Sequence, residues 1–338
     1  MAVEIIGTGR ALPARKVTNQ ELAQRLDTSD EWIRSHTGIG SRHIADEQTA
    51  ASDLGAAAGL QALGWALEQG AVAEKSTAEL ALTLDLIVVG TTTPDYYGCP
   101  ATSCLIQHLL GAKNAAAMDV TAACSGFIYG LETAAALLNA DPRRRRALVI
   151  GTDVLSRLTN WEDRSTCILF GDGAGAVVLE KKASDRGIVR TVLGADGSGW
   201  ENLVVRRGGS RAAWKKGETV DNGMTLTMNG QAVYHFAVGI ITETIAKILA
   251  EERIGMEDIL YIVPHQANAR IIQAAAKRLK IPEEKFYINV EEYANTSSAS
   301  IPIALDELNR SGALHKGGLV ITVGFGSGLT YGGNLIRW

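Results

Sequence analysis

The feature that most constrains the fold of this chain is an order of strand, loop and helix that occurs twice. Residues 85–90 form an apolar, strand-like run followed by a loop and a helix near 101–110, and residues 258–263 are followed by a loop and a helix near 269–279. Two further matches continue in order, 117–120 with 287–290 and 147–151 with 319–324. Chance similarity between α/β segments is the alternative. Two like halves packed about a pseudo-dyad would bring the loops after corresponding strands together.

The rest of the chain predicts an α/β protein, because strand-like and helix-like segments alternate. Strands are expected at 3–7, 86–90, 116–120, 147–151, 174–180, 188–193, 260–263, 286–290 and 319–323. The run at 86–90 is continuously apolar, which is typical of a strand buried on both faces. Helices are expected after a start at Thr28–Glu31, and over the Ala-rich segment 52–69.

Composition and charge exclude several classes of function. The chain has 338 residues, of which 46% are apolar and 21% charged, so it can bury a large core. The net charge is −4 and there is no basic stripe, which argues against a nucleic-acid partner. The run Arg143–Arg146 lies between a predicted helix and a strand, and a solvated turn is the preferred interpretation.

Cysteine usage and hydropathy favour a cytoplasmic protein without a metal site. The four cysteines, Cys99, Cys104, Cys124 and Cys167, form no C-x-x-C pair and have no histidine partners at zinc spacing. Neither a secretory signal nor an apolar stretch near the roughly 20 residues of a membrane helix is expected. Free thiols suit a reducing compartment, where a cysteine is retained either as core filler or for its reactivity.

Cys124 is the strongest candidate nucleophile. It follows a predicted strand and begins an Ala- and Leu-rich helix, in the sequence Asp119–Phe127. A thiol at a helix N-terminus faces unpaired N–H groups and the positive end of the dipole, which favours the thiolate. A cysteine among small residues is also a common core residue, so position alone leaves both interpretations open.

Two polar residues follow predicted strands in the second half. His265 comes just past the carboxyl end of a strand, which is where open α/β sheets bind ligands. A structural, hydrogen-bonded histidine is the alternative. Asn295 is by default an N-cap for a helix beginning near Ala299, but its amide would also suit an enolate or oxyanion. The glycines of 324–328 either expose backbone N–H groups to a developing charge or form a tight turn.

These segments together resemble β-ketoacyl-acyl-carrier-protein synthase III, the enzyme that starts type II fatty-acid synthesis. The resemblance runs from Ile5 to the C-terminus, and it includes Thr28–Trp32, Phe170–Ala174 and the closing glycine loop. It implies the thiolase fold, with two pseudo-symmetric halves (1–184 and 185–338) in a five-layer αβαβα arrangement, usually as a homodimer. It also implies a decarboxylative condensation of an acyl-CoA primer with malonyl-acyl-carrier protein, with neither a metal nor a cofactor.

The resemblance also implies roles for single residues. Cys124 would take the acyl group, His265 and Asn295 would promote decarboxylation, and the N–H groups of Cys124 and Ser327 would form the oxyanion hole. The residues implied in coenzyme A binding are Thr28, Trp32, Arg164 and Asn268, with Trp32 and Arg164 on either side of the adenine. Carrier-protein contacts would come from Gln266 and Arg270, with Lys277 and Arg278 nearby, and Cys99 would lie at the end of the acyl pocket.

The sequence departs from the family pattern at three of these places. His36 replaces a common arginine near the nucleotide, Ser327 a frequent glycine, and Cys99 a frequent phenylalanine. The alternatives are a relative in secondary metabolism with the same triad, a degradative thiolase, and a silent subunit or binding module. A thiolase would usually have a second cysteine near its end, and none follows Cys167. A silent partner would tolerate loss of the triad, whose three members are present here.

Overall fold

Two β-sheets carry the same strand order, as the repeat in the sequence predicts. The structure is a computed structural model and describes residues 1–218 and 222–338. One sheet has the order β1-β7-β6-β4-β5, with strands Ala2–Ala11, Asp172–Lys182, Arg146–Val154, Leu86–Gly90 and Ala116–Val120. The other has the order β8-β13-β12-β11, with strands Gly187–Ala195, Thr330–Arg337, Leu319–Gly326 and Ile259–Pro264.

The directions of strand pairing repeat as well. In each sheet the first two pairs are antiparallel, and the next pair, β6 with β4 or β12 with β11, is parallel. Where the first sheet adds β5 beside β4, the second has a single parallel bridge between Ile262 and Phe286. The expected strand at 286–290 is therefore wrong in extent, since Val290 already begins helix α10 (Val290–Tyr293).

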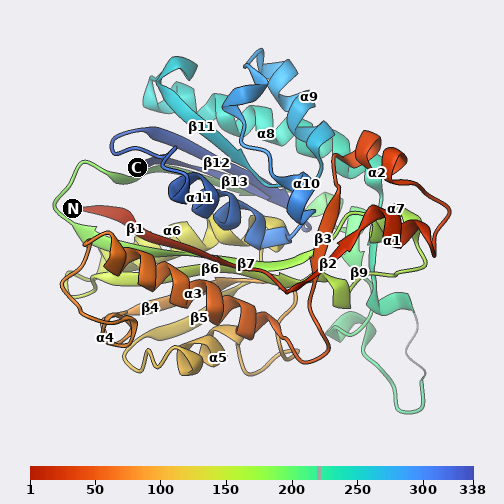
Figure 1. Cartoon of the computed structure of the whole chain (residues 1–338), viewed down its shortest axis with the longest axis horizontal. Coiled ribbons are helices and arrows are strands. Elements are labelled where there is room, and N and C mark those ends of the chain that lie inside the picture. Colours follow the sequence, from red (N-terminus) through yellow and green to blue (C-terminus); the bar gives the residue numbers. More distant parts are fainter. Residues whose placement is uncertain (219–221) are drawn as a thin grey trace.

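Helices form three layers around the two sheets, as Figure 1 shows. The outer face of the first sheet is covered by α3 (Ala51–Glu68), α4 (Thr77–Ala81) and α5 (Thr102–Leu109). Between the sheets lie α6 (Gly126–Ala140) and α11 (Ser300–Arg310), and α8 (Gly230–Glu252) and α9 (Ala269–Leu279) cover the second sheet. The expected five-layer αβαβα arrangement is confirmed.

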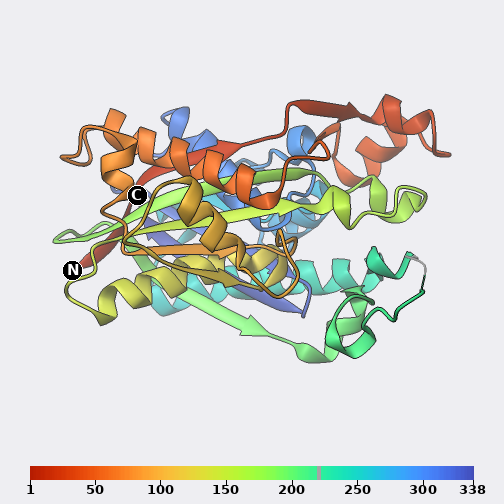
Figure 2. The same cartoon turned by 90° about the horizontal axis from the view of Figure 1, so that it is seen from below.

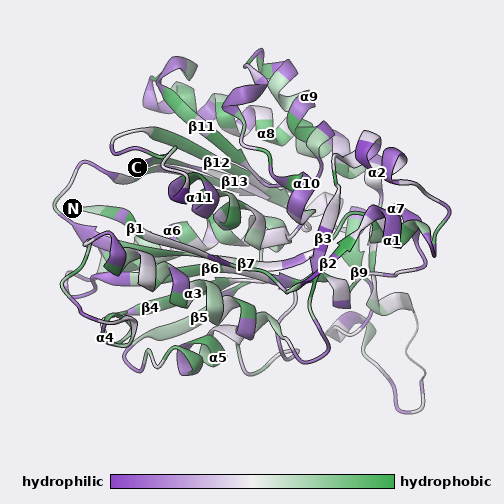
Figure 3. Cartoon of the chain, viewed as in Figure 1, coloured by the Kyte–Doolittle hydropathy of each residue, from purple (hydrophilic) through white to green (hydrophobic). Residues whose placement is uncertain are grey.

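The apolar runs of the inner strands β4, β6, β7 and β12 arise because both faces of these strands are buried. In β4, Ile87 and Val89 pack toward α3, whereas Leu86 and Val88 pack toward the middle helices. This alternation follows from the two-residue period of a strand. Figure 3 shows the same distribution, with hydrophobic residues along the central strands and on the helix faces that meet them.

The remaining short elements gather at one end of the sheets. They are the strand pairs β2 (Arg15–Thr18) with β3 (Ser41–Ile44) and β9 (Leu203–Val205) with β10 (Leu226–Met228), and the helices α1 (Asn19–Ala23), α2 (Asp30–Thr37) and α7 (Arg164–Cys167). Figures 1 and 2 place most of them at the end of the molecule opposite to the two termini. The loops that carry Cys124, His265 and Asn295 open toward them.

Helix α8 departs from the expectation that no apolar segment approaches membrane length. It has 23 residues, and by length and composition it could cross a membrane. In the fold, however, Val233, Ala237, Ile241, Ile245 and Ile248 pack in the core formed with the second sheet and α9. An apolar helix with a buried face is what the outer layer of such a fold requires.

The basic run 143–146 is only partly the solvated turn that its sequence suggests. Arg143 and Arg145 are exposed, whereas Arg146 is buried at the start of β6. Its guanidinium pairs with Glu74 and Glu180, so its charge is neutralised where it is removed from water. The run therefore begins as a surface turn and ends as a structural ion pair.

Candidate active site

Cys124 lies on a sharp turn between β5 and α6. The turn is the 3₁₀ segment Ala123–Ser125, and Ala123 has a left-handed backbone with φ +47°. Helix α6 can start there because Gly126 approaches Gly90 at the end of β4, where a Cβ on Gly90 would lie 2.6 Å from the Gly126 carbonyl carbon. A strained non-glycine residue before a candidate nucleophile is typical of functional turns.

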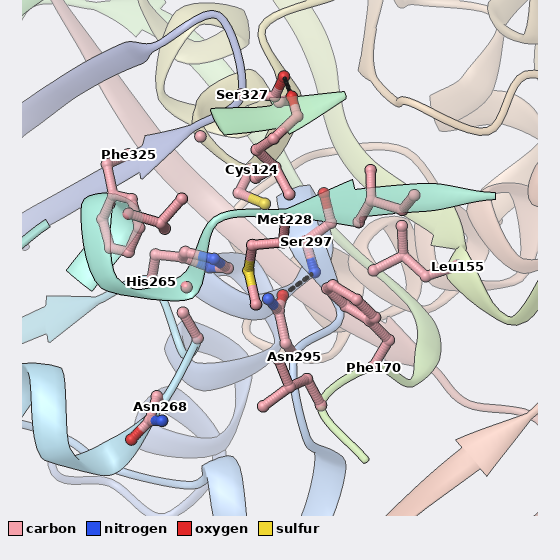
Figure 4. A pocket seen from close by; sticks show the side chains of 18 of the residues that line it. Cys124, Leu155, Phe170, Met228, His265, Asn268, Asn295, Ser297, Phe325 and Ser327 are labelled. Carbon is pink, nitrogen blue, oxygen red and sulfur yellow. Dashed lines mark hydrogen bonds between the residues drawn. The ribbon is translucent and has the colours of Figure 1, made fainter. Parts of the chain in front are cut away.

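A single cavity of about 430 Å³ contains the three predicted triad residues. Figure 4 shows Cys124, His265 and Asn295 around the same space, each from a different loop. Part of the cavity wall is apolar and consists of Leu155, Leu158, Phe170, Leu203, Val205, Leu226 and Met228. The sequence did not reveal this wall, because its residues come from loops, a 3₁₀ turn and the short strands β9 and β10.

His265 is held in one orientation and kept neutral. It follows β11, and its backbone N–H donates to the Val323 carbonyl at 2.8 Å. Burial lowers the pKa of its imidazole to about 3, so the ring is uncharged at neutral pH. Its Nδ1 lies 2.7 Å from the Ser300 hydroxyl, which also accepts the Gln266 backbone N–H at 3.3 Å.

Ser300 allows the histidine tautomer that the predicted role needs. The Gln266 N–H occupies one lone pair of the Ser300 oxygen, and the serine proton can be donated to His265 Nδ1. With that bond formed, the imidazole proton lies on Nε2, the nitrogen that does not bond to Ser300. A neutral histidine with Nε2–H is a hydrogen-bond donor to whatever anion forms in the cavity.

Ser300→Ala should therefore impair the step that uses His265 while leaving acyl transfer to Cys124 nearly unchanged. Loss of the hydrogen-bond partner that orients a functional histidine typically lowers activity about 10–100-fold. The measurement is the rate of condensation of preformed acyl-enzyme, compared with the rate of acyl-enzyme formation. Equal loss in both rates would show that Ser300 supports the fold of the site instead.

Asn295 is fixed by its own loop, with its amide left for the cavity. Its backbone N–H donates to Leu169 O at 2.9 Å, and its side-chain Oδ1 accepts the Ser297 N–H at 2.8 Å. The latter bond is the dashed line of Figure 4. Helix α11 begins at Ser300, so Asn295 is not its N-cap, and the default interpretation of this residue is wrong. The Nδ2 donor is what the side chain offers to a ligand.

The electrostatics of Cys124 run opposite to the expectation from the helix dipole. Burial raises the pKa of the Cys124 thiol to about 12, and the charge of Asp153 raises it further, whereas Ser297 and the backbone N–H of Cys124 lower it. The resting thiol is thus protonated at neutral pH. The donors around the sulfur reduce the cost of forming a thiolate but do not remove it.

Strand β12 brings a second backbone segment against Cys124. Gly326 ends β12, and a Cβ there would lie 2.6 Å from Cys124 N, so only glycine permits this approach. Ser327 follows and lines the cavity, with its hydroxyl donating to Leu203 O. The sequence-predicted pair of oxyanion donors, Cys124 and Ser327, therefore lies on two segments in direct contact.

Comparison with known proteins assigns this architecture. The sequence profile of 3-oxoacyl-[acyl-carrier-protein (ACP)] synthase III matches residues 118–197, and that of its C-terminal part matches residues 249–338. The β-ketoacyl-[acyl-carrier-protein] synthase III of Clostridium acetobutylicum is 43% identical over 100% of this chain and 99% of its own. The chain belongs to the β-ketoacyl-[acyl-carrier-protein] synthase III family.

Solved structures agree with this assignment. The 3-oxoacyl-[acyl-carrier-protein] synthase III of Aquifex aeolicus VF5 has a TM-score of 0.88 and 40% identity, covering 99% of this chain and 100% of that one. The priming β-ketosynthase of the R1128 polyketide pathway has a TM-score of 0.85 and 34% identity, covering 99% and 96%. The predictions of a thiolase-fold condensing enzyme and of its family are confirmed.

The residues expected to bind a nucleotide in a synthase III cluster beside α2. Trp32 stacks on His36, with the ring centroids 4.2 Å apart. The Arg164 guanidinium lies 4.9 Å from the centre of the Trp32 ring. An aromatic base between Trp32 and Arg164 would need about 7–8 Å, twice the usual contact distance. Arg164 must therefore move away before an adenine can enter between them.

Two other residues of this group lie close by. Thr28 precedes α2, and its hydroxyl oxygen is buried without a hydrogen-bond partner in the part of the chain that the structure describes. Asn268 lines the cavity and caps α9, accepting the Arg270 N–H at 2.8 Å and donating to His36 O at 3.2 Å. Asn268 thereby ties α9 to α2.

Two predicted site residues have surroundings that differ from their expected roles. Gln266 is 1% exposed, and its amide bonds to Pro264 O, Tyr287 O and Asn289 N, so its side chain faces the interior of this chain. Cys99 is exposed and does not line the cavity of its own chain. Arg270, in contrast, is exposed on α9 as expected.

Proposed function

We propose that this chain is a 3-oxoacyl-[acyl-carrier-protein] synthase III that condenses an acyl-CoA primer with malonyl-acyl-carrier protein and so starts type II fatty-acid synthesis. The observation that carries the proposal is the convergence of a half-buried thiol, a neutral histidine and an amide donor on one cavity with a partly apolar wall. The thiol can store an acyl group, and the two neutral donors suit an enolate.

The first half-reaction is acyl transfer to Cys124. The sulfur attacks the thioester carbon of acyl-CoA, the C–S bond to coenzyme A breaks, and coenzyme A leaves as its thiol with the proton that Cys124 gives up. The oxyanion of the tetrahedral intermediate would accept hydrogen bonds from the backbone N–H groups of Cys124 and Ser327. The acyl chain would lie along the apolar part of the cavity wall, which includes Leu155, Leu203 and Met228.

The second half-reaction forms the carbon–carbon bond. Loss of CO₂ from the malonyl thioester leaves an enolate, whose oxygen would accept hydrogen bonds from His265 Nε2 and Asn295 Nδ2. The enolate carbon then attacks the stored thioester, and Cys124 leaves as the thiolate. A neutral His265 suits this role, because it donates without having to give up its proton.

The test is mass spectrometry of the intact protein with a panel of acyl-CoAs, followed by malonyl-carrier protein. A stored acyl group that malonyl-carrier protein converts to a 3-oxoacyl-carrier protein would support the proposal. If the acyl pocket is closed by the partner's Cys99, which is smaller than phenylalanine, longer or branched primers are expected to label the enzyme. Labelling by acetyl-CoA alone would contradict that primer choice, and no labelling by any acyl-CoA would contradict the function.

A condensing enzyme of secondary metabolism with the same triad is the second candidate, favoured by the likeness to the R1128 priming ketosynthase. The same experiment separates the two. An acyl-enzyme that does not turn over with malonyl-carrier protein, but does so with another acceptor, would support this candidate. Aryl or strongly branched primers preferred over straight ones would point in the same direction.

The carrier protein is proposed to dock beside α9. Arg270, Lys277 and Arg278 are exposed on this helix, and an acidic partner would be attracted to them. Arg270→Glu should raise KM for malonyl-carrier protein about tenfold, because reversing a surface charge slows the association of an oppositely charged partner. Acylation by acyl-CoA should be nearly unchanged. Lys316→Glu, an exposed position in the loop before β12 that does not line the cavity, is the matched control. Equal loss in both half-reactions would mean that Arg270 is structural.

A cytoplasmic homodimer is part of the proposal. All four cysteines are free thiols, which suits a reducing compartment. Strand β5 is an edge of the first sheet, and Tyr96 and Tyr97 are exposed by 57% and 67% in the loop that carries Cys99. Such an apolar loop beside an open edge suits a second copy of the chain. Cys99 would reach an acyl pocket only if that pocket belongs to the partner.

A further inference from the structure

Ser297 lines the cavity, yet the reaction above gives it no task. It opens the 3₁₀ turn Ser297–Ala299, two residues after Asn295, and its backbone is left-handed with φ +52°. Its N–H is used by Asn295. Its hydroxyl oxygen is buried and has no hydrogen-bond partner of good geometry among residues 1–218 and 222–338. A buried polar group without a partner calls for an explanation, and function is one.

The turn that carries Ser297 packs against the turn that carries Cys124, and both residues line the same cavity (Figure 4). The Ser297 side chain acts to lower the pKa of the Cys124 thiol. A hydroxyl can rotate its proton toward a sulfur that gains charge. Hydrogen bonds of this kind are often loose in a resting site and tighten when the reaction develops.

The next residue along the turn lies beside a carboxylate. Ser298 donates its backbone N–H to the Asp153 carboxylate at 3.2 Å, and its hydroxyl lies 2.7 Å from both that carboxylate and the Gly90 carbonyl oxygen, to one of which it can donate. Asp153 is fully buried, and its charge opposes ionisation of Cys124. The turn thus places one hydroxyl beside the Asp153 carboxylate and the preceding hydroxyl in the cavity that Cys124 lines.

We propose that Ser297 is a further catalytic residue, whose hydroxyl donates a hydrogen bond to the Cys124 sulfur while that sulfur is negatively charged. The inference deepens the proposed function and rests on it. During acylation the bond would act as the thiol loses its proton and attacks. During condensation it would act when the C–S bond of the tetrahedral intermediate breaks and the sulfur leaves with the electron pair. Ser297 keeps its own proton in both steps.

The test is Ser297→Ala, with the pH dependence of Cys124 alkylation as the first readout. Iodoacetamide labelling followed by peptide mapping reports Cys124 separately from the exposed Cys99 and Cys104. Because only the thiolate reacts, loss of the donor should move the rate profile to higher pH by about one unit. Acyl-enzyme formation should fall about 10–100-fold, as expected for a hydrogen bond to a charged group.

Two control variants separate the hydroxyl from the backbone. Thr296→Val removes the neighbouring buried hydroxyl, which also lacks a partner in the described chain but does not line the cavity, and it should leave the alkylation profile unchanged. Ser297→Gly removes the hydroxyl and also relieves the left-handed strain, so it should behave like Ser297→Ala. Normal reactivity in the glycine variant would overturn the inference and make strain the cause.

The failure of this inference can be told apart from failure of the proposed function. If the unmodified enzyme forms acyl-enzyme and Ser297→Ala alkylates with an unchanged pH profile, only the role of Ser297 is overturned. Adding Ser297→Ala to Cys124→Ala should not slow decarboxylation of malonyl-carrier protein, because no sulfur remains to be stabilised. A slower decarboxylation in that double variant would assign Ser297 to the positioning of Asn295 instead.

Discussion

Replacing Cys124 by alanine should abolish acyl-enzyme formation, while malonyl-carrier protein can still be decarboxylated. Removal of a catalytic nucleophile typically costs about 10⁴–10⁶ in rate, because no neighbouring group can store the acyl chain. Decarboxylation should survive, since the donors that we assign to the enolate belong to His265 and Asn295. Intact mass spectrometry reports the first effect, and release of CO₂ from malonyl-carrier protein reports the second.

Cys104→Ala is the matched control for this prediction. Cys104 is exposed on α5 and does not line the cavity, so its loss should leave both half-reactions unchanged. Acyl-enzyme formation that persists in Cys124→Ala would place the nucleophile elsewhere and would contradict the proposed function. Loss of decarboxylation together with acylation would show that Cys124 is needed to hold the malonyl group.

The elements that sequence reasoning predicted well are those defined by burial on both faces. Strand β4 begins and ends where its apolar run does, because all five of its residues are buried between helix layers. The repeat predicted the equivalent strand order of the two sheets. Cys124 and His265 could be found because each follows a strand end, where side chains of a layered α/β fold meet a ligand.

What sequence reasoning missed depends on contacts between distant segments. The bond between His265 and Ser300 joins residues 35 positions apart, and the cavity wall from β9 and β10 comes from strands of three residues each. The resemblance implied a carrier-protein contact for Gln266, whereas the loop turns this side chain inward, where it bonds three backbone groups. The pKa of Cys124 depends on its depth, which the dipole argument from its position in the chain does not include.

His265→Ala and Asn295→Ala should keep much of the acylation and lose condensation. Each substitution removes one donor from the enolate oxygen, and the loss of one placed donor typically costs about 10²–10³ in rate. Acyl-enzyme should therefore accumulate in both variants when acyl-CoA and malonyl-carrier protein are supplied together. Rapid-quench mass spectrometry follows the accumulation, and Asn268→Ala serves as a comparison that removes an amide from a different part of the cavity.

The pH dependence of condensation tests the same assignment from another direction. Burial lowers the pKa of His265 to about 3, so its neutral form persists from about pH 4 upward, and the rate should show no titration of this group between pH 5 and 8. A base that takes the Cys124 proton would instead need a pKa nearer to neutrality. If His265→Ala fails to acylate at all and the wild-type rate falls below pH 7, histidine activates the sulfur as in a Cys–His protease pair. Retained acylation and a flat profile would leave the ionisation of Cys124 to the backbone N–H groups and hydroxyl that surround it.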